Sequence, residues 1–96
     1  MKQPCVYILA NQARGTLYIG VTSNLIGRIW QHKQNLVDGF TKKHELHLLV
    51  YFETAETMLT AIAREKQLKK WERAWKIELI ESINNDWRDL YVDLVP

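Results

Sequence analysis

The chain has 96 residues, enough for one compact domain, which excludes a multidomain enzyme or a repeat array. Its hydrophobic fraction is 47% and its charged fraction 25%, values typical of a globular protein rather than a disordered one. The net charge is only +2, but residues 64–76 hold six Lys or Arg and two acids, whereas residues 77–96 hold one Arg and five acids. A basic segment of this kind suits an anionic partner.

Cys5 is the only cysteine, which excludes an internal disulfide and a cysteine-rich zinc site. The longest apolar runs, residues 5–10 and 48–52, are far shorter than the about 18 residues that a membrane helix needs. The N-terminus lacks the apolar core of a signal peptide. We therefore expect a cytoplasmic protein with no membrane partner.

The first half of the chain predicts a hairpin followed by a helix. Residues 5–10 and 16–21 are apolar and rich in β-branched and aromatic side chains, and residues 11–15 between them end in a glycine. Capping side chains then precede apolar residues at helical spacing, which predicts a helix over 24–37. Asp38 and Gly39 end this helix.

The second half predicts one more strand and two helices. We expect a polar loop over 40–45 and a strand over 47–52. A long helix begins at Thr54 or Thr57 and ends near Lys70, and another covers 72–84. The tail, residues 85–96, is expected to pack through Trp87, Leu90 and Tyr91.

These elements predict an α+β fold in the order β-β-α-β-α-α. The sheet has three strands, is mainly antiparallel and is flanked by helices on both faces. We expect a single domain over 1–96, with its core over about 3–84.

Two tyrosines are candidates for a site on the hairpin. A two- or four-residue loop within 11–16 pairs Leu9 with Tyr18 and Tyr7 with Gly20, which places both phenols on one face, roughly 7 Å apart. A three-residue loop would place them on opposite faces. Strand tyrosines are also ordinary core residues, so this pair alone does not decide the function.

Three further polar residues lie beside or within apolar helix faces. Arg28 and His32 are four residues apart and share one flank of the first helix, either as a solvated pair or as groups that reach a groove above the sheet. Glu65 projects into the apolar arc of the second helix, where a carboxylate is costly unless it is paired or bound to a metal. A simple ion pair with a nearby lysine is the alternative for Glu65.

Basic residues on one loop and two helices are candidates for contacts to phosphates. They could equally form an ordinary solvated face, and His44 and His47 are expected at the surface or at a strand edge. The candidates for nucleic-acid binding are Lys42, Lys43, Lys66, Lys69, Lys70 and Arg73.

Four segments of the chain resemble the GIY-YIG endonuclease domain, and more narrowly its small stand-alone bacterial members, the UPF0213-like group. The resemblance covers nearly the whole chain. It is carried by Val6–Leu9, Tyr18–Thr22, Ala63–Lys69, and Asn84 with Trp87, Asp89 and Leu90.

The resemblance implies roles for particular residues. Tyr7 and Tyr18 match the tyrosines of the two triplets, and Arg28 matches the helix arginine of the family. Glu65 matches the metal-binding glutamate, and His32 stands where members carry Tyr or His. Gly20 matches the glycine that closes the second triplet. Asn84 matches the polar residue that the family carries near the end of the domain, and the adjacent Asn85 is an equally near candidate for that position.

Two departures from the family pattern affect the expected activity. Cys5 and Val6 replace the Gly and Ile of the first triplet, which leaves the tyrosine in place. Val21 stands where several nucleases carry a lysine, which removes one possible phosphate contact.

These residues suit the hydrolysis of a phosphodiester. Arg28 can hold a phosphate, and Glu65 can bind one Mg²⁺ or Mn²⁺ ion, weakly in the absence of nucleic acid. The base is Tyr7, Tyr18 or His32, and nearby Arg28 and the metal are expected to lower the pKa of a tyrosine.

We expect a metal-dependent endonuclease, with DNA favoured over RNA and with structure-directed or weak sequence specificity. Such a protein would act in DNA repair or recombination, with a possible protein partner supplying specificity. The alternatives are a nearly inactive nucleic-acid-binding module on the same scaffold, or an interaction domain that uses Trp30, Trp71 or Trp87. Monomer and homodimer both stay open.

Overall fold

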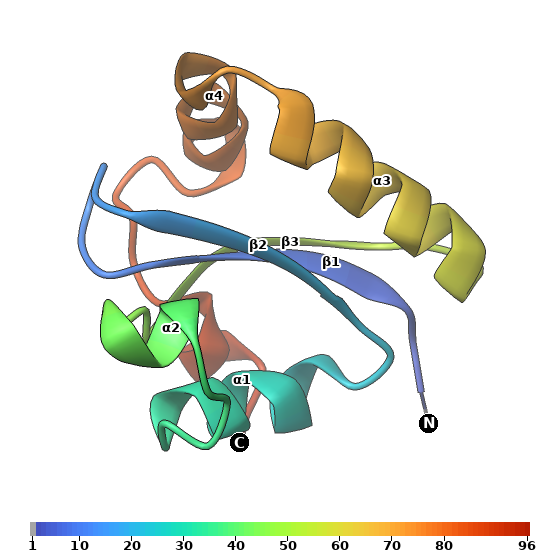
Figure 1. Cartoon of the computed structure of the whole chain (residues 1–96), viewed down its shortest axis with the longest axis horizontal. Helices are drawn as coiled ribbons and strands as arrows, with labels where there is room; N and C mark the ends of the chain where they lie inside the picture. The colour runs from blue at the N-terminus through green and yellow to red at the C-terminus, as the bar shows by residue number, and fades with distance from the viewer. Residues whose placement is uncertain (1) are drawn as a thin grey trace.

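The computed structural model describes residues 2–96 and contains one antiparallel sheet. The strands are β1 (Cys5–Ala10), β2 (Leu17–Thr22) and β3 (Leu48–Thr54), in the spatial order β2-β1-β3. β1 lies in the centre and every one of its residues is buried, which explains its uninterrupted apolar run. The α+β fold and the β-β-α-β-α-α order are confirmed, with one short helix added (Figure 1).

Helices cover both faces of the sheet, as the sequence predicts. On one face lie α3 (Met58–Lys70) and α4 (Arg73–Ile83); on the other lie α1 (Leu25–Lys33), the short α2 (Phe40–Lys43) and the 3-10 turn η1 (Leu90–Asp93) (Figure 1). Because successive strand residues point to opposite faces, β1 supplies both cores. Val6 and Ile8 belong to the core beneath α3 and α4, and Tyr7 and Leu9 to the core beneath α1.

The ends of two helices differ from the prediction. α1 ends at Lys33 rather than near residue 37, because Asn35 adopts a left-handed conformation with φ 56°. Leu36 is consequently 62% exposed instead of packing on the helix face. Of the two residues predicted to start α3, Thr54 and Thr57, the helix is capped by Thr57. The Thr57 side chain accepts a hydrogen bond from the Thr60 backbone N–H in a capping box. None of the helices within residues 2–96 is both long and apolar enough to cross a membrane.

The predicted loop over 40–45 is wrong in part, because residues 40–43 form α2. Gly39 precedes it with φ 104°, a conformation that favours glycine, and this turn directs the chain back toward α1. Four residues are too few to produce a helical hydrophobic pattern, so hydrophobic periodicity in the sequence does not predict α2.

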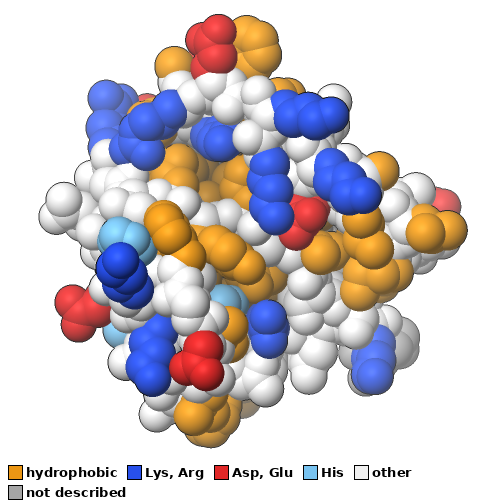
Figure 2. Space-filling view, in the orientation of Figure 1, with side chains coloured by type: hydrophobic (Ala, Val, Ile, Leu, Met, Phe, Trp, Pro, Cys, Tyr) orange, Lys and Arg blue, Asp and Glu red, His pale blue; other side chains and the backbone are white. Residues whose placement is uncertain are grey.

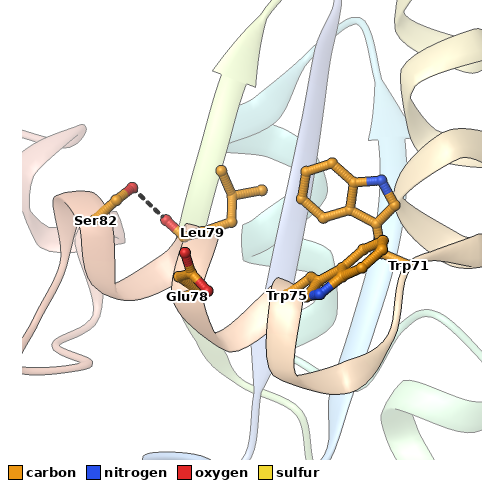
Figure 3. A pocket seen from close by; sticks show the side chains of 5 residues that line it. All are labelled: Trp71, Trp75, Glu78, Leu79 and Ser82. Atoms are coloured by element: carbon orange, nitrogen blue, oxygen red, sulfur yellow. Dashed lines mark hydrogen bonds between the residues drawn. The ribbon is translucent and has the colours of Figure 1, made fainter.

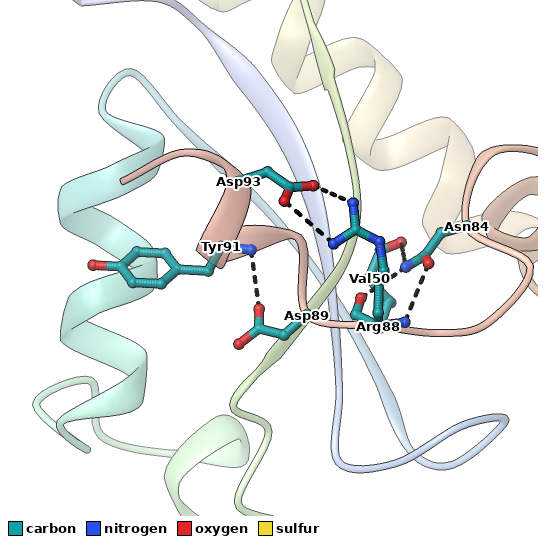
Figure 4. A network of polar contacts seen from close by, with 6 residues as sticks. All are labelled: Val50, Asn84, Arg88, Asp89, Tyr91 and Asp93. Atoms are coloured by element: carbon teal, nitrogen blue, oxygen red, sulfur yellow. Dashed lines mark hydrogen bonds and ion pairs between the residues drawn. The ribbon is translucent and has the colours of Figure 1, made fainter. Parts of the chain in front are cut away.

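The tail is held against β3, the edge strand opposite β2 (Figure 4). The Asn84 side chain donates to the carbonyls of Val50 and Arg88, at 3.0 and 2.8 Å, and the Asp89 carboxylate accepts the Leu49 N–H at 3.1 Å. The predicted packing of the tail is confirmed by the burial of Trp87 and Leu90.

Candidate active site

Three aromatic side chains meet on the α1 face of the sheet. The ring centroids of Tyr7 and Tyr18 are 6.3 Å apart, and His32 lies 5.7 Å from the first and 5.9 Å from the second. Tyr7 pairs with Gly20 and Leu9 with Tyr18, the predicted register, although residues 11–16 connect the strands rather than a loop of two or four residues. Because directly opposite residues share a face, this register puts both phenols on the same side.

Gly20 makes room for the Tyr7 ring. A Cβ atom added at Gly20 would lie 2.4 Å from both the Cζ and the Oη atom of Tyr7. No side chain fits that space unless the tyrosine moves, so the glycine closing the second triplet positions the tyrosine of the first.

A chain of hydrogen bonds runs from Tyr7 through His32 to Thr41. The Tyr7 hydroxyl and His32 Nε2 are 2.9 Å apart, and His32 Nδ1 and Thr41 Oγ1 are 3.1 Å apart. The three residues are 1%, 2% and 4% exposed, so these contacts are shielded from water. A neutral imidazole donates from one nitrogen and accepts at the other, and both hydroxyls can do either, so a proton can be passed along this chain in either direction.

Burial sets the protonation of this chain. It lowers the pKa of His32 to about 4, with the nearby positive charge of Arg28 as the next cause, so the imidazole is neutral at pH 7. Burial also raises the pKa of Tyr7 to about 12, and the neighbouring Tyr18 and Glu65 act in the same direction. The expected lowering by Arg28 is present but is outweighed, so for Tyr7 that prediction is wrong in its net sign.

Arg28 lines a groove that none of these three rings lines, but its charge is close enough to affect the pKa of both Tyr7 and His32. The groove has a volume of about 410 Å³ and is bounded by the end of β2, the first turns of α1 and Met58 at the start of α3. Val21, the position of the missing family lysine, lines the same groove. A phosphate seated there would meet the Arg28 guanidinium, which binds anions through a planar pair of donors.

Glu65 approaches from α3, on the other face of the sheet, near edge strand β2. Its negative charge contributes to the raised pKa of Tyr7. The Glu65 side chain is 15% exposed and its carboxylate lies 3.3 Å from Lys69 Nζ, so the predicted ion pair is present. Within residues 2–96 no group of three His, Cys, Asp or Glu side chains could hold a metal ion. Glu65 therefore fits a hard divalent ion only as a single protein ligand, whose shell water and a phosphate would complete.

The remaining predicted residues lie outside this cluster. Lys and Arg side chains gather over α3 and α4, above a hollow in which hydrophobic side chains are visible (Figure 2). Arg73 donates to the carbonyls of Arg14 and Gly15, at 2.5 and 2.6 Å, and so ties α4 to the hairpin loop. Asn84 has the tail contacts described above. Exposed side chains belong to Lys42, Lys43, Lys66, Lys69 and Lys70.

Another cavity lies away from the tyrosines, at the junction of α3 and α4. It has a volume of about 480 Å³, and Leu79, Glu78 and Ser82 line it together with two indoles. These indoles, Trp71 and Trp75, meet edge to face with centroids 6.0 Å apart (Figure 3). None of the phosphate-binding or proton-carrying candidates lines this cavity.

Sequence reasoning missed Thr41 and Phe40. Both lie on α2: the Thr41 side chain points inward to His32, and the Phe40 ring packs beside Tyr18 with centroids 6.4 Å apart. The only signal for this element in the sequence is the Asp38-Gly39 turn before it.

Comparisons with known proteins identify the family of the chain. The family model for the GIY-YIG catalytic domain matches residues 3–78. Relatives include UPF0213 proteins of Clostridium perfringens, 39% identical over 77 residues (80% of this chain, 82% of that protein), and of Syntrophus aciditrophicus, 34% identical over 82 residues (84% and 93%). A UPF0213 protein of Pediococcus pentosaceus is 35% identical over 69 residues, covering 72% of this chain and 73% of its own. No solved structure matches the chain.

Proposed function

Because the chain belongs to the GIY-YIG catalytic-domain family, a nuclease family, we propose that it is an endonuclease that requires a divalent metal ion. The observation that carries this proposal is the meeting of Tyr7, Tyr18 and His32, with Arg28 close enough to affect the pKa of both Tyr7 and His32. Arg28 would hold the scissile phosphate in the groove that it lines and stabilise the negative charge that builds on the phosphate oxygens.

Tyr18 is the phenol best placed to contact the attacking water. It is partly exposed, whereas Tyr7 is 1% exposed and directed at His32. Proton transfer from Tyr7 to His32 is strongly uphill, because the pKa of Tyr7 is raised to about 12 and that of His32 is lowered to about 4. We therefore assign the buried pair to orientation of the site, and Tyr18, which would act in its phenolate form, to taking the proton from the attacking water.

Glu65 would hold a Mg²⁺ or Mn²⁺ ion when nucleic acid is bound. The ion supplies stabilisation of negative charge at the leaving oxygen. Before it can bind a metal, the Glu65 carboxylate must release Lys69, which is half exposed and free to turn toward solvent or a phosphate.

DNA is the proposed substrate, with structure-directed or weak sequence specificity. The described residues form one sheet and the helices that cover it. The basic side chains of α2, α3 and α4 suit contacts to phosphates rather than to bases. Specificity would then come from the shape of the nucleic acid or from a partner protein.

The test is a cleavage panel of flaps, junctions, nicked duplex, single strands and RNA, each with Mg²⁺ or Mn²⁺. Glu65→Gln and Arg28→Ala should abolish cutting, while Glu72→Gln, at an α4 N-cap position with no side-chain hydrogen bond, should leave it unchanged. Undiminished cutting by Glu65→Gln would overturn the metal role. Binding by the wild-type protein with no cutting of any substrate would favour the nucleic-acid-binding module.

A further inference from the structure

Phe40 is an exposed aromatic ring at the rim of the tyrosine cluster. It keeps 47% of its surface exposed, although its ring lies at 25° to that of Tyr18 with centroids 6.4 Å apart. His44 lies 4.4 Å from Phe40, centroid to centroid. Phe40 and His44 are both exposed, so these two rings carry the aromatic cluster to the surface.

The helix that carries Phe40 is also basic. Lys42 and Lys43 are both exposed, and Lys42 pairs with Asp38 only through a solvent-exposed contact of 3.5 Å. An aromatic face flanked by lysines is the combination with which proteins bind single-stranded nucleic acid, the ring stacking on a base and the ammonium groups contacting the backbone.

We propose that Phe40 and His44 form a stacking platform for an unpaired nucleobase next to the scissile phosphate. The proposal rests on the function proposed above and specifies which part of the substrate this surface takes. The Phe40 ring lies 6.4 Å from that of Tyr18, so a base on it would lie close to the tyrosine cluster.

A nucleobase fits this surface better than a protein partner does. The exposed apolar surface at this place is the Phe40 ring, next to the lysines of α2. A stable protein interface buries about 800 Å² on each partner. The platform also explains a preference for branched or frayed substrates, because a base in an intact duplex is not free to leave its stack.

The test measures binding and stacking without cleavage. Oligodeoxynucleotide flaps carrying 2-aminopurine at the junction are titrated in EDTA, and its fluorescence is quenched when the base stacks on a ring; the matching oligoribonucleotides distinguish DNA from RNA. Wild-type protein should bind and quench. Phe40→Ala should bind about 5- to 30-fold more weakly and lose the quenching, and Phe40→Trp should restore both.

Trp30→Ala is the matched control, because Trp30 is 49% exposed and lies on α1. It should bind and quench like the wild type. Full quenching by Phe40→Ala, or an equal loss in Trp30→Ala, would overturn the platform while the nuclease proposal stands. Failure of the wild-type protein to bind any of the oligonucleotides would overturn both.

Discussion

The Nδ1 atom of His32 lies 3.1 Å from the Oγ1 atom of Thr41, a residue of α2 that is 4% exposed. With Tyr7 at the other ring nitrogen, the imidazole is fixed at both ends. Its orientation therefore depends on a four-residue helix that contributes no ionisable group to the proton path. Thr41 is a positioning residue, and its removal is the most direct way to test the chain of hydrogen bonds.

Thr41→Val should reduce the free energy of unfolding by about 1–3 kcal/mol, because it leaves a buried imidazole nitrogen without a partner. In cleavage assays kcat should fall while KM changes little, since Thr41 does not line the Arg28 groove. Urea denaturation and steady-state kinetics provide the measurements. Thr41→Ser keeps the hydroxyl and should behave nearly as the wild type; equal losses in both variants would show that the hydroxyl is unimportant.

The buried imidazole predicts a loss of stability in acid. Its pKa is lowered to about 4 in the folded protein, against about 6.5 in an unfolded chain, so protonation favours unfolding. The stabilisation is complete above about pH 6.5 and is lost as the pH falls toward 4. His32→Gln should flatten the stability profile in this window. His44→Gln, which changes an exposed histidine, should leave the slope unaltered, and a slope that persists in His32→Gln would contradict the assignment.

Val21→Lys should strengthen nucleic-acid binding, because Val21 lines the same groove as Arg28. One added phosphate contact steepens the dependence of log K on log salt concentration by about 0.9 for duplex DNA. Fluorescence anisotropy between about 50 and 200 mM salt, in EDTA, measures that slope. Val92→Lys makes the same change on the tail, where Val92 is 61% exposed, and should not reproduce the effect. An identical slope for the two variants would rule out a specific role for the groove.

Gly20→Ala should disturb the site through Tyr7, since the new Cβ atom would lie 2.4 Å from the Tyr7 ring. We expect a cost of about 1–3 kcal/mol in stability and a lower kcat. In a Tyr7→Ala background the same substitution should cost much less, because the atoms it meets are gone. Additive costs in this double-mutant cycle would contradict a direct clash.

The sequence predicted those parts of the site that follow from strand register. Pairing Tyr7 with Gly20 follows from the length of the hairpin loop, and it brings both phenols to one face. His32 was expected at a half-shielded flank, but it is 2% exposed because α2 folds over it. That arrangement depends on the positive φ of Gly39 and on a single Thr41 contact, neither of which produces a periodic pattern.

Side-chain pairing was beyond the sequence where the partners lie far apart in the chain. The Glu65–Lys69 pair is not such a case, because i,i+4 spacing on a helix favours Lys69 over the adjacent Lys66. In a helical-wheel projection of α1, Lys33 lies among the apolar residues. Its ammonium group nevertheless donates to the His47 carbonyl at 2.8 Å and forms an ion pair with Asp89 of the tail. Such a contact joins residues far apart in the chain, so helical geometry alone does not predict it.

The contacts of the tail with β3 bear on where this domain ends. Trp87 belongs to the core beneath α3 and α4, and Leu90 to the core beneath α1, so the last residues join the two halves of the molecule around one border of the sheet. Those halves carry Glu65 and Arg28, respectively. The family match stops at residue 78, so a protein shortened to that point would lose the buried Trp87 and Leu90 side chains that connect these two layers.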